Sequence, residues 1–188
     1  MNVKEAIEKR RTIRKFEQRA VDKGLLLDMV DCARLSAYGA NLQPLKFGII
    51  DDAKRCSELF ENIKWAGYLP DGAPKDGEKP MAYIAVLGDT KIKASAQFEC
   101  DAGAAVTSMM LYAVDMGLAT CWLGAINREN IHGILGLGDD LKVVYLLAVG
   151  YPKQESEACD MVDGNVKYYE DENGKIHVPK RSMNEILV

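Results

Sequence analysis

The sequence has few of the residues on which metal and cysteine chemistry depend. Its 188 residues include two histidines, His132 and His177, and five cysteines that form no Cys-x-x-Cys pair. Structural zinc sites place their ligands in close pairs, and disulfide frameworks contain an even number of cysteines. We therefore expect no metal site and no disulfide framework. The chain also lacks Gly-x-Ser-x-Gly and P-loop motifs, which argues against α/β-hydrolase and P-loop NTPase chemistry.

Long apolar runs and an excess of positive charge are missing too. No stretch approaches the ~20 apolar residues that span a bilayer, and the charged opening MNVKEAIEKRR lacks the apolar run of a signal peptide. The net charge of -4 argues against nucleic acid or a membrane surface as the main partner. We expect a cytoplasmic protein with a single domain over residues 1–188, because this length can bury a substantial core.

Helical patterns alternate with short apolar runs along the chain. We expect helices over residues 2–10, 22–35, 52–60, 94–116 and 127–135, and strands over 46–50, 82–87, 120–123 and 141–149. Asn173-Gly174 lies between two β-prone pieces and predicts a hairpin. Residues 61–80 contain three of the six prolines and predict an irregular loop that borders a binding site. Because there is no clean βαβ series, we expect an α+β or mixed α/β sandwich.

A basic cluster follows the first expected helix. Arg10, Arg11, Thr12 and Arg14 place three guanidiniums and one hydroxyl within five positions. Arginine presents a planar fork of donors that pairs with two phosphate oxygens at once, which favours a phosphate or another anion as ligand. A solvated basic helix end, stabilised by the helix dipole, is the alternative, and on composition alone it is the commoner explanation.

Two other segments could contact a flat polar ligand. Asn41 and Gln43 are two positions apart, and their carboxamides offer both donors and acceptors to one polar edge. The alternative is a loop whose amides bind its own backbone. Leu123 and Gly124 end an expected strand, where a glycine lets backbone N–H groups approach a ligand closely. Simple strand termination is the alternative there.

Several short segments occur in a fixed order along the chain. They are Arg10-Arg11-Thr12-Ile13-Arg14-Lys15-Phe16, Asn41-Leu42-Gln43-Pro44, Phe47-Gly48-Ile49-Ile50, Asp115-Met116-Gly117-Leu118-Ala119-Thr120, Cys121-Trp122-Leu123-Gly124, Gly150-Tyr151-Pro152 and Lys180-Arg181. In this order they resemble the FMN-dependent nitroreductase family. The resemblance spans nearly the whole chain, and residues 61–80 and 153–175 match least.

The resemblance implies a fold, a cofactor and its contacts. The fold is an α+β three-layer sandwich with a mostly antiparallel central sheet, and two chains form an intertwined homodimer with one FMN at each of two interface sites. Arg10 with Lys180 or Arg181 would bind the FMN phosphate, and Thr12 would supply a hydroxyl there. Arg14 would lie near flavin N1 and the C2 carbonyl. The implied cofactor contacts come from Arg10, Arg11, Thr12, Arg14, Asn41, Gln43, Leu123, Gly124, Lys180 and Arg181.

The resemblance also implies how Asn41, Gly124 and Gln43 would contact the cofactor. Asn41 would approach the flavin from the other subunit, and Gly124 would offer backbone contacts near N5. Gln43 could instead only shape its loop. The chain departs from many relatives at Tyr38-Gly39-Ala40, where small hydroxyl residues are usual, and at Leu45, where tryptophan is usual. Both departures concern the face of the flavin where substrate lies.

The implied activity is an NADH- or NADPH-dependent oxidoreductase. Hydride would pass through flavin N5 to a small oxidised acceptor such as a nitroaromatic or a quinone, with Arg14 as electrostatic support and no other catalytic side chain. A dehalogenase or flavin-fragmenting enzyme on the same scaffold is one alternative, and a non-enzymatic FMN-binding protein is another. The small-residue helix 94–116 and the Asn173-Gly174 tail favour a homodimer. Residues 61–80 could take the place of a lid.

Overall fold

A four-stranded antiparallel sheet forms the centre of the molecule. The computed structural model describes residues 1–94 and 97–188. The strands β1 (Leu45–Ile50), β2 (Ala82–Asp89), β3 (Ala119–Leu123) and β4 (Leu141–Gly150) lie in the order β1-β2-β4-β3. The two inner strands, β2 and β4, are the most buried because both of their faces are covered. All four predicted strands are therefore confirmed, as is the antiparallel arrangement.

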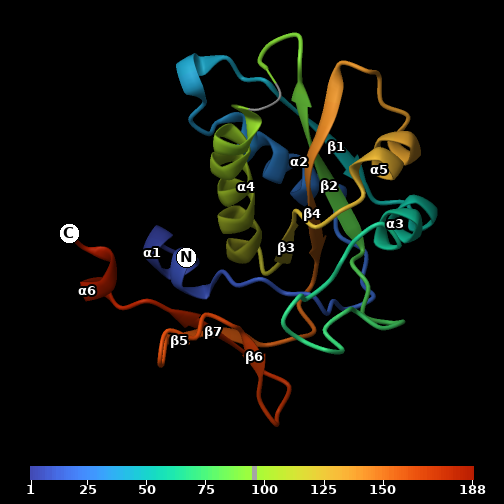
Figure 1. Ribbon diagram of the computed structural model, residues 1–188. Helices are drawn as coiled ribbons and strands as arrows, with labels where there is room; N and C mark the ends of the chain where they lie inside the picture. The colour runs from blue at the N-terminus through green and yellow to red at the C-terminus, as the bar shows by residue number, and fades with distance from the viewer. Residues whose placement is uncertain (95–96) are drawn as a thin grey trace.

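Helices cover both faces of this sheet (Figure 1). On one face α2 (Lys23–Arg34) and α4 (Phe98–Asp115) pack against Ile84 and Val86, and on the other α3 (Ala53–Phe60) and α5 (Arg128–Leu135) pack near Tyr83. Successive side chains of a strand point to opposite faces, so β2 contributes to both layers of the core. The three-layer α+β sandwich is confirmed.

Local signals set the helix ends. Asp22 and Asp52 cap α2 and α3 by accepting backbone N–H groups, and Asn127 caps α5 in the same way. The short helix α1 (Val3–Lys9) is capped by Asn2. These boundaries agree with the predicted ones within two residues.

The fourth helix is shorter than predicted. It begins at Phe98, so Ala94 lies before it, while residues 95–96 of the predicted helix lie outside the described residues. Lys93 forms an ion pair with Asp101 of α4, which holds the preceding turn against the helix. Gly88 makes room for the first helical residue, because a Cβ there would meet the Phe98 ring at 2.3 Å.

A second, three-stranded sheet follows the sandwich. Its strands β5 (Ser156–Asp160), β6 (Tyr169–Glu170) and β7 (Ile176–Lys180) lie in the order β5-β7-β6. The β6–β7 pair is the predicted hairpin, with Gly174 at φ 81°, whereas β5 was not predicted and pairs in parallel with β7. The chain ends with α6 (Met183–Ile186), on the side of the molecule where α1 lies (Figure 1). Among the described residues, no helix has the length and apolarity to cross a membrane.

Candidate functional site

The basic segment Arg10–Arg14 runs alongside the edge strand β3. Thr12 forms a parallel bridge with Thr120, and the Ile13 N–H donates to the Thr120 carbonyl over 3.0 Å. Ile13 and Phe16 are buried in the core. Their burial fixes the path of the segment, and Thr12 and Arg14 stay half-exposed beside the strand.

The arginines of this segment have no anionic partner. Among residues 1–94 and 97–188, Arg10, Arg11 and Arg14 make no ion pair with a carboxylate. Burial, and then the neighbouring Arg11, lower the pKa of Arg10. The buried Nε of Arg11 has no hydrogen-bond partner within the described residues. A desolvated cationic cluster of this kind is costly unless an anion neutralises it, so the segment is a candidate anion site.

Arg14 is held from two sides by the C-terminal part of the chain. Its guanidinium carbon lies 4.6 Å from the centre of the Tyr168 ring, a cation–π contact. Its backbone N–H donates to Gln154 Oε1 over 3.3 Å. Tyr168 in turn lies against Tyr68, with ring centres 5.0 Å apart. The segments 61–80 and 153–175 thus meet over Arg14.

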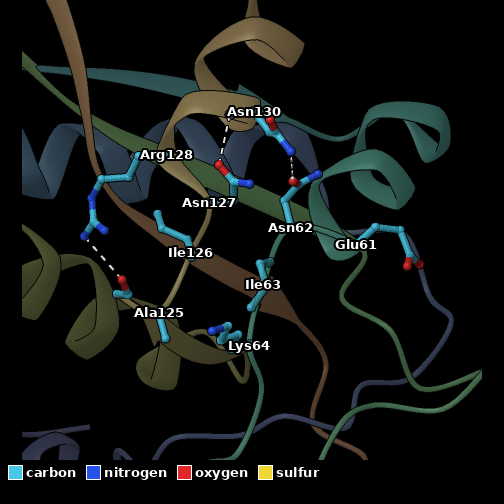
Figure 2. A pocket seen from close by; sticks show the side chains of 10 residues that line it. Glu61, Asn62, Ile63, Lys64, Ala125, Ile126, Asn127, Arg128 and Asn130 are labelled. Atoms are coloured by element: carbon cyan, nitrogen blue, oxygen red, sulfur yellow. Dashed lines mark hydrogen bonds between the residues drawn. The ribbon is translucent and has the colours of Figure 1, made fainter.

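Gly124 opens the far end of β3 to a pocket of about 670 Å³ (Figure 2). Gly124 is exposed and could offer its backbone to a ligand, whereas Leu123 is 6% exposed with its side chain in the core. Leu123 can therefore contact a ligand only through its backbone.

Sequence reasoning missed Lys64 and Arg128, which both line this pocket (Figure 2). Arg128 donates to the carbonyl oxygens of Gly124 and Val144 over 3.2 and 3.1 Å. The Lys64 N–H donates to the Ala125 carbonyl over 2.9 Å, which ties the irregular loop to the end of β3. Gly124, the irregular loop 61–80 and the Asn127 cap had pointed to this region, but no local pattern singled out Lys64 or Arg128, because their contacts join residues far apart in sequence.

The loop that carries Asn41 and Gln43 has an unusual backbone. Ala40, Asn41 and Gln43 have φ of 48°, 55° and 51°, a region that costs non-glycine residues free energy. Gln43 Nε2 donates to the Asn41 carbonyl over 3.2 Å, so part of this amide binds its own loop. Strained backbone of this kind is often found where a ligand is held.

A buried carboxylate fixes this loop. Asp101 is 3% exposed, accepts the Gly39 N–H over 2.9 Å and pairs with Lys93 Nζ over 2.7 Å. Burial by itself would raise the pKa of Asp101, but the Gly39 N–H and the Lys93 ammonium lower it overall. The loop is therefore tied to the first turn of α4 by a charged group.

Within one chain, the Asn41 loop and the basic segment lie at opposite ends of α4 (Figure 1). Gly39 is bonded to Asp101 near the start of the helix, and the Met1 amino group pairs with Asp115 at its end over 2.9 Å. At 1.5 Å per residue these two positions are about 21 Å apart. One chain therefore does not bring Asn41 and Arg10 together.

Lys180 and Arg181 lie at the end of β7. Both are exposed, and Arg181 pairs with Glu185 over 3.3 Å. In the part of the chain that the structure describes, neither is hydrogen-bonded to the Arg10–Arg14 segment. The grouping of these residues around one phosphate therefore stays a prediction.

The strand beside the basic segment contains one cysteine, Cys121. Burial raises the pKa of Cys121, on β3, to about 11, so it is a thiol at neutral pH. Among the described residues, no three His, Cys, Asp or Glu side chains form a group that could hold a metal ion.

Comparison with known protein families identifies the chain. The family model described as the nitroreductase family matches residues 7–79 and 79–151, which is more than half of the sequence. The chain belongs to the nitroreductase family. The matched residues include the basic segment, the Asn41 loop and the end of β3 at Gly124.

Relatives in the nitroreductase family share the fold over most of their length. A protein of Archaeoglobus fulgidus with the provisional name NADH dehydrogenase/NAD(P)H nitroreductase is 26% identical over 160 residues, 82% of this chain and 87% of the relative. A crystal structure from Desulfovibrio desulfuricans, in complex with FMN, is 25% identical with a TM-score of 0.75 and covers 100% of this chain and 96% of the other. A nitroreductase family structure from Clostridium novyi is 29% identical with a TM-score of 0.69, over 81% and 88% of the two chains.

The residues of this nitroreductase-family chain fit FMN. Arg10 and Arg11, which pair with no carboxylate among residues 1–94 and 97–188, offer cationic donors to a phosphate. Arg14 and the exposed backbone at Gly124 lie along the same strand, β3, where a flat ring system could extend. The donor set is cationic at one end and backbone-lined at the other, which matches an anionic phosphate joined to a planar ring.

Proposed function

We propose that the chain is an FMN-dependent oxidoreductase that passes hydride from NADH or NADPH to a small oxidised acceptor, such as a nitroaromatic or a quinone. The observation that carries this proposal is the desolvated arginine cluster beside β3, which has no carboxylate partner among the described residues. The FMN complex of the Desulfovibrio desulfuricans relative supports the choice of cofactor. When bound, FMN supplies hydride transfer at N5.

The residues of the chain bind the cofactor, orient it and stabilise the charge that develops on it. Arg10 and Arg11, with the Thr12 hydroxyl and Lys180 or Arg181, hold the phosphate by charge-assisted hydrogen bonds. Arg14 stabilises negative charge near N1 electrostatically, because its guanidinium is fixed against Tyr168 and need not reorganise. Gly124, with the Leu123 backbone, contacts the N5 edge. Asn41 and Gln43 approach from a second copy of the chain.

A homodimer is part of the proposal, because in one chain the Asn41 loop and the basic segment lie at opposite ends of α4, where Asp101 and Asp115 are about 21 Å apart. Several apolar side chains are exposed and would be covered in a dimer. Val3 and Ile7 on α1 are 72% and 54% exposed. Met183, Ile186 and Leu187 at the C-terminus are exposed as well. We expect a dimeric mass by light scattering at micromolar concentration, and a monomeric mass would contradict this part. The proposed location is the cytoplasm.

The first experiment is an absorption spectrum of the purified protein, with chromatography of the chromophore released on denaturation. We expect flavin bands and FMN, followed by steady oxidation of NADH or NADPH when a quinone or a nitroaromatic is added. A colourless protein that takes up no added FMN would overturn the proposal. FMN binding without turnover would instead indicate a non-enzymatic flavin-binding protein.

A further inference from the structure

A second pocket, of about 320 Å³, lies beside the Asn41 loop at the edge strand β1. Its lining comes from α2, from the loop and from β1, and includes Arg34, Tyr38, Gln43, Lys46 and Phe47. Pockets for small molecules usually measure about 300–1,000 Å³. A cavity at the lower end of this range accommodates a molecule with a single ring.

The charges of this pocket have one sign. Arg34 and Lys46 are both cationic, and no acidic side chain is among the described residues that line the pocket. Lys46 makes no side-chain hydrogen bond or ion pair with any described residue, and Arg34 uses its Nε for Asp31 Oδ1 over 2.7 Å. An unpaired ammonium beside a guanidinium favours a carboxylate or a similar anion.

The walls of the pocket are aromatic. Tyr38 and Phe47 are half-buried and pack at the edge of the core. The Tyr38 hydroxyl donates to the Ala33 carbonyl over 2.8 Å, which fixes the ring. Aromatic side chains attract flat rings in stacked or edge-to-face arrangements. The pocket therefore combines flat apolar walls with a cationic rim.

We propose that this pocket binds the acceptor and selects small aromatic carboxylates. Lys46 and Arg34 bind the carboxylate, and the rings of Tyr38 and Phe47 enclose the aromatic part. The inference rests on the proposed function, because the pocket shares Gln43 with the loop that would bring Asn41 to the FMN of the partner.

The test compares two acceptors of nearly equal shape, 4-nitrobenzoate and 4-nitrobenzamide, with the FMN-loaded protein. In both reactions one hydride from NADH or NADPH and one proton convert the nitro group to a nitroso group and water, so the stoichiometry is the same. The carboxylate withdraws electrons from the nitro group less strongly than the amide does, so a preference for the carboxylate does not come from an intrinsically easier reduction. We expect kcat/KM to be about tenfold higher for the carboxylate, because it gains a hydrogen bond to a charged group. The gain should lower KM and leave kcat unchanged. Added salt should reduce the preference.

Lys46→Gln is the test variant and Lys54→Gln the control. Lys54 is an exposed residue of α3, on the other face of the sheet. We expect Lys46→Gln to bring the ratio of the two kcat/KM values close to one and Lys54→Gln to retain it. Calorimetry with benzoate gives a readout independent of turnover: its Kd should rise about tenfold in Lys46→Gln alone.

The possible outcomes distinguish a failure of the pocket assignment from a failure of the proposed function. Turnover with equal kcat/KM for the two acceptors, or a preference that survives in Lys46→Gln, would overturn the pocket assignment and leave the proposed function in place. A protein that binds no FMN would overturn the oxidoreductase assignment and the acceptor role together. Benzoate binding that is as tight in Lys46→Gln as in the unchanged protein would also overturn the pocket assignment.

Discussion

At the scale of single residues, Arg14 is the side chain whose surroundings most directly bear on the proposed chemistry. It lies against the Tyr168 ring, and its backbone is bonded to Gln154. A cation held in place before the reaction stabilises developing charge without paying for reorganisation. Tyr168 therefore acts as a positioning residue for Arg14, although it lies in a part of the chain where the family resemblance is weak.

We expect Arg14→Ala to lower kcat by about 10²-fold and to make the flavin reduction potential more negative. Tyr168→Leu should shift both in the same direction by a smaller amount, about two- to fivefold in kcat, because it removes the cation–π contact and the ring contact with Tyr68 but leaves the guanidinium itself in place. Arg19→Ala is the control, since Arg19 makes a similar contact with Tyr151, 3.9 Å from the ring centre. Unchanged turnover and potential in Arg14→Ala would show that the role assigned to Arg14 is wrong.

Gly88 shows how one residue without a side chain supports the packing of α4. A Cβ at this position would come within 2.3 Å of the Phe98 ring, which is 2% exposed and cannot swing into solvent. We expect Gly88→Ala to lower the free energy of unfolding by about 1–3 kcal/mol through overpacking. Gly133→Ala, within α5, meets nothing within 4 Å and should stabilise by about 0.5–1 kcal/mol. Urea unfolding of both variants would measure the contrast, and equal effects would contradict it.

At the scale of elements, the strained Asn41 loop depends on its attachment to α4. Three of its residues have positive φ, and Asp101 holds Gly39 and Lys93 together at the helix start. Removing one partner of a buried pair leaves the other desolvated and unpaired. The loop geometry that would present Asn41 to FMN therefore depends on a carboxylate that is remote from it in sequence.

We expect Asp101→Asn to lower the free energy of unfolding by about 2–3 kcal/mol, below the usual cost for a fully buried pair because Lys93 is partly exposed. FMN should also bind more weakly. The matched control is Asp115→Asn, at the other end of the same helix, where a 36% exposed carboxylate pairs with the terminal amine and solvent screens the pair, so its loss should lower stability much less. An Asp101→Asn protein as stable as the control variant would contradict the role of this pair.

The pH dependence of the same pair has a defined sign. The folded-state pKa of Asp101 is lowered, so its contribution is present above the unfolded value of about 3.9 and is lost as pH falls through the folded value. The difference in stability between the unchanged protein and Asp101→Asn should therefore be constant near neutrality and shrink below about pH 4. Urea unfolding at several pH values measures this difference, and growth of the difference on acidification would show that the sign is wrong.

The elements that the sequence predicted well are those with local signals. Helix caps at Asp22 and Asn127, and the Asn173-Gly174 turn, are readable within a few residues. By contrast, β5 is half-exposed and gains its partner, β7, only through parallel pairing across the intervening chain. The contacts of Arg128 with Val144 and of Asp101 with Gly39 are non-local in the same way. These parts of the candidate site could not be predicted, because no short pattern encodes a contact between distant residues.

At the scale of the whole molecule, the proposed site requires two chains. The basic segment and the Asn41 loop belong to opposite ends of α4, about 21 Å apart. In a closed two-fold dimer every contact between the two chains occurs twice, so the dimer contains two copies of the same composite site. Loss of Arg10 from one chain and of Asn41 from the other then damages the two sites unequally.

This inequality can be tested by mixing variants. Arg10→Ala and Asn41→Ala homodimers should each bind FMN weakly, because both of their sites lack one group. In a mixed dimer one site lacks both groups, whereas the other combines the intact Arg10 of one chain with the intact Asn41 of its partner and is complete. Refolding the two variants together should therefore restore tight binding at one site of each mixed dimer, measured by flavin fluorescence titration. If each site lay within one chain, mixing would restore nothing, because every site would still carry one of the two substitutions.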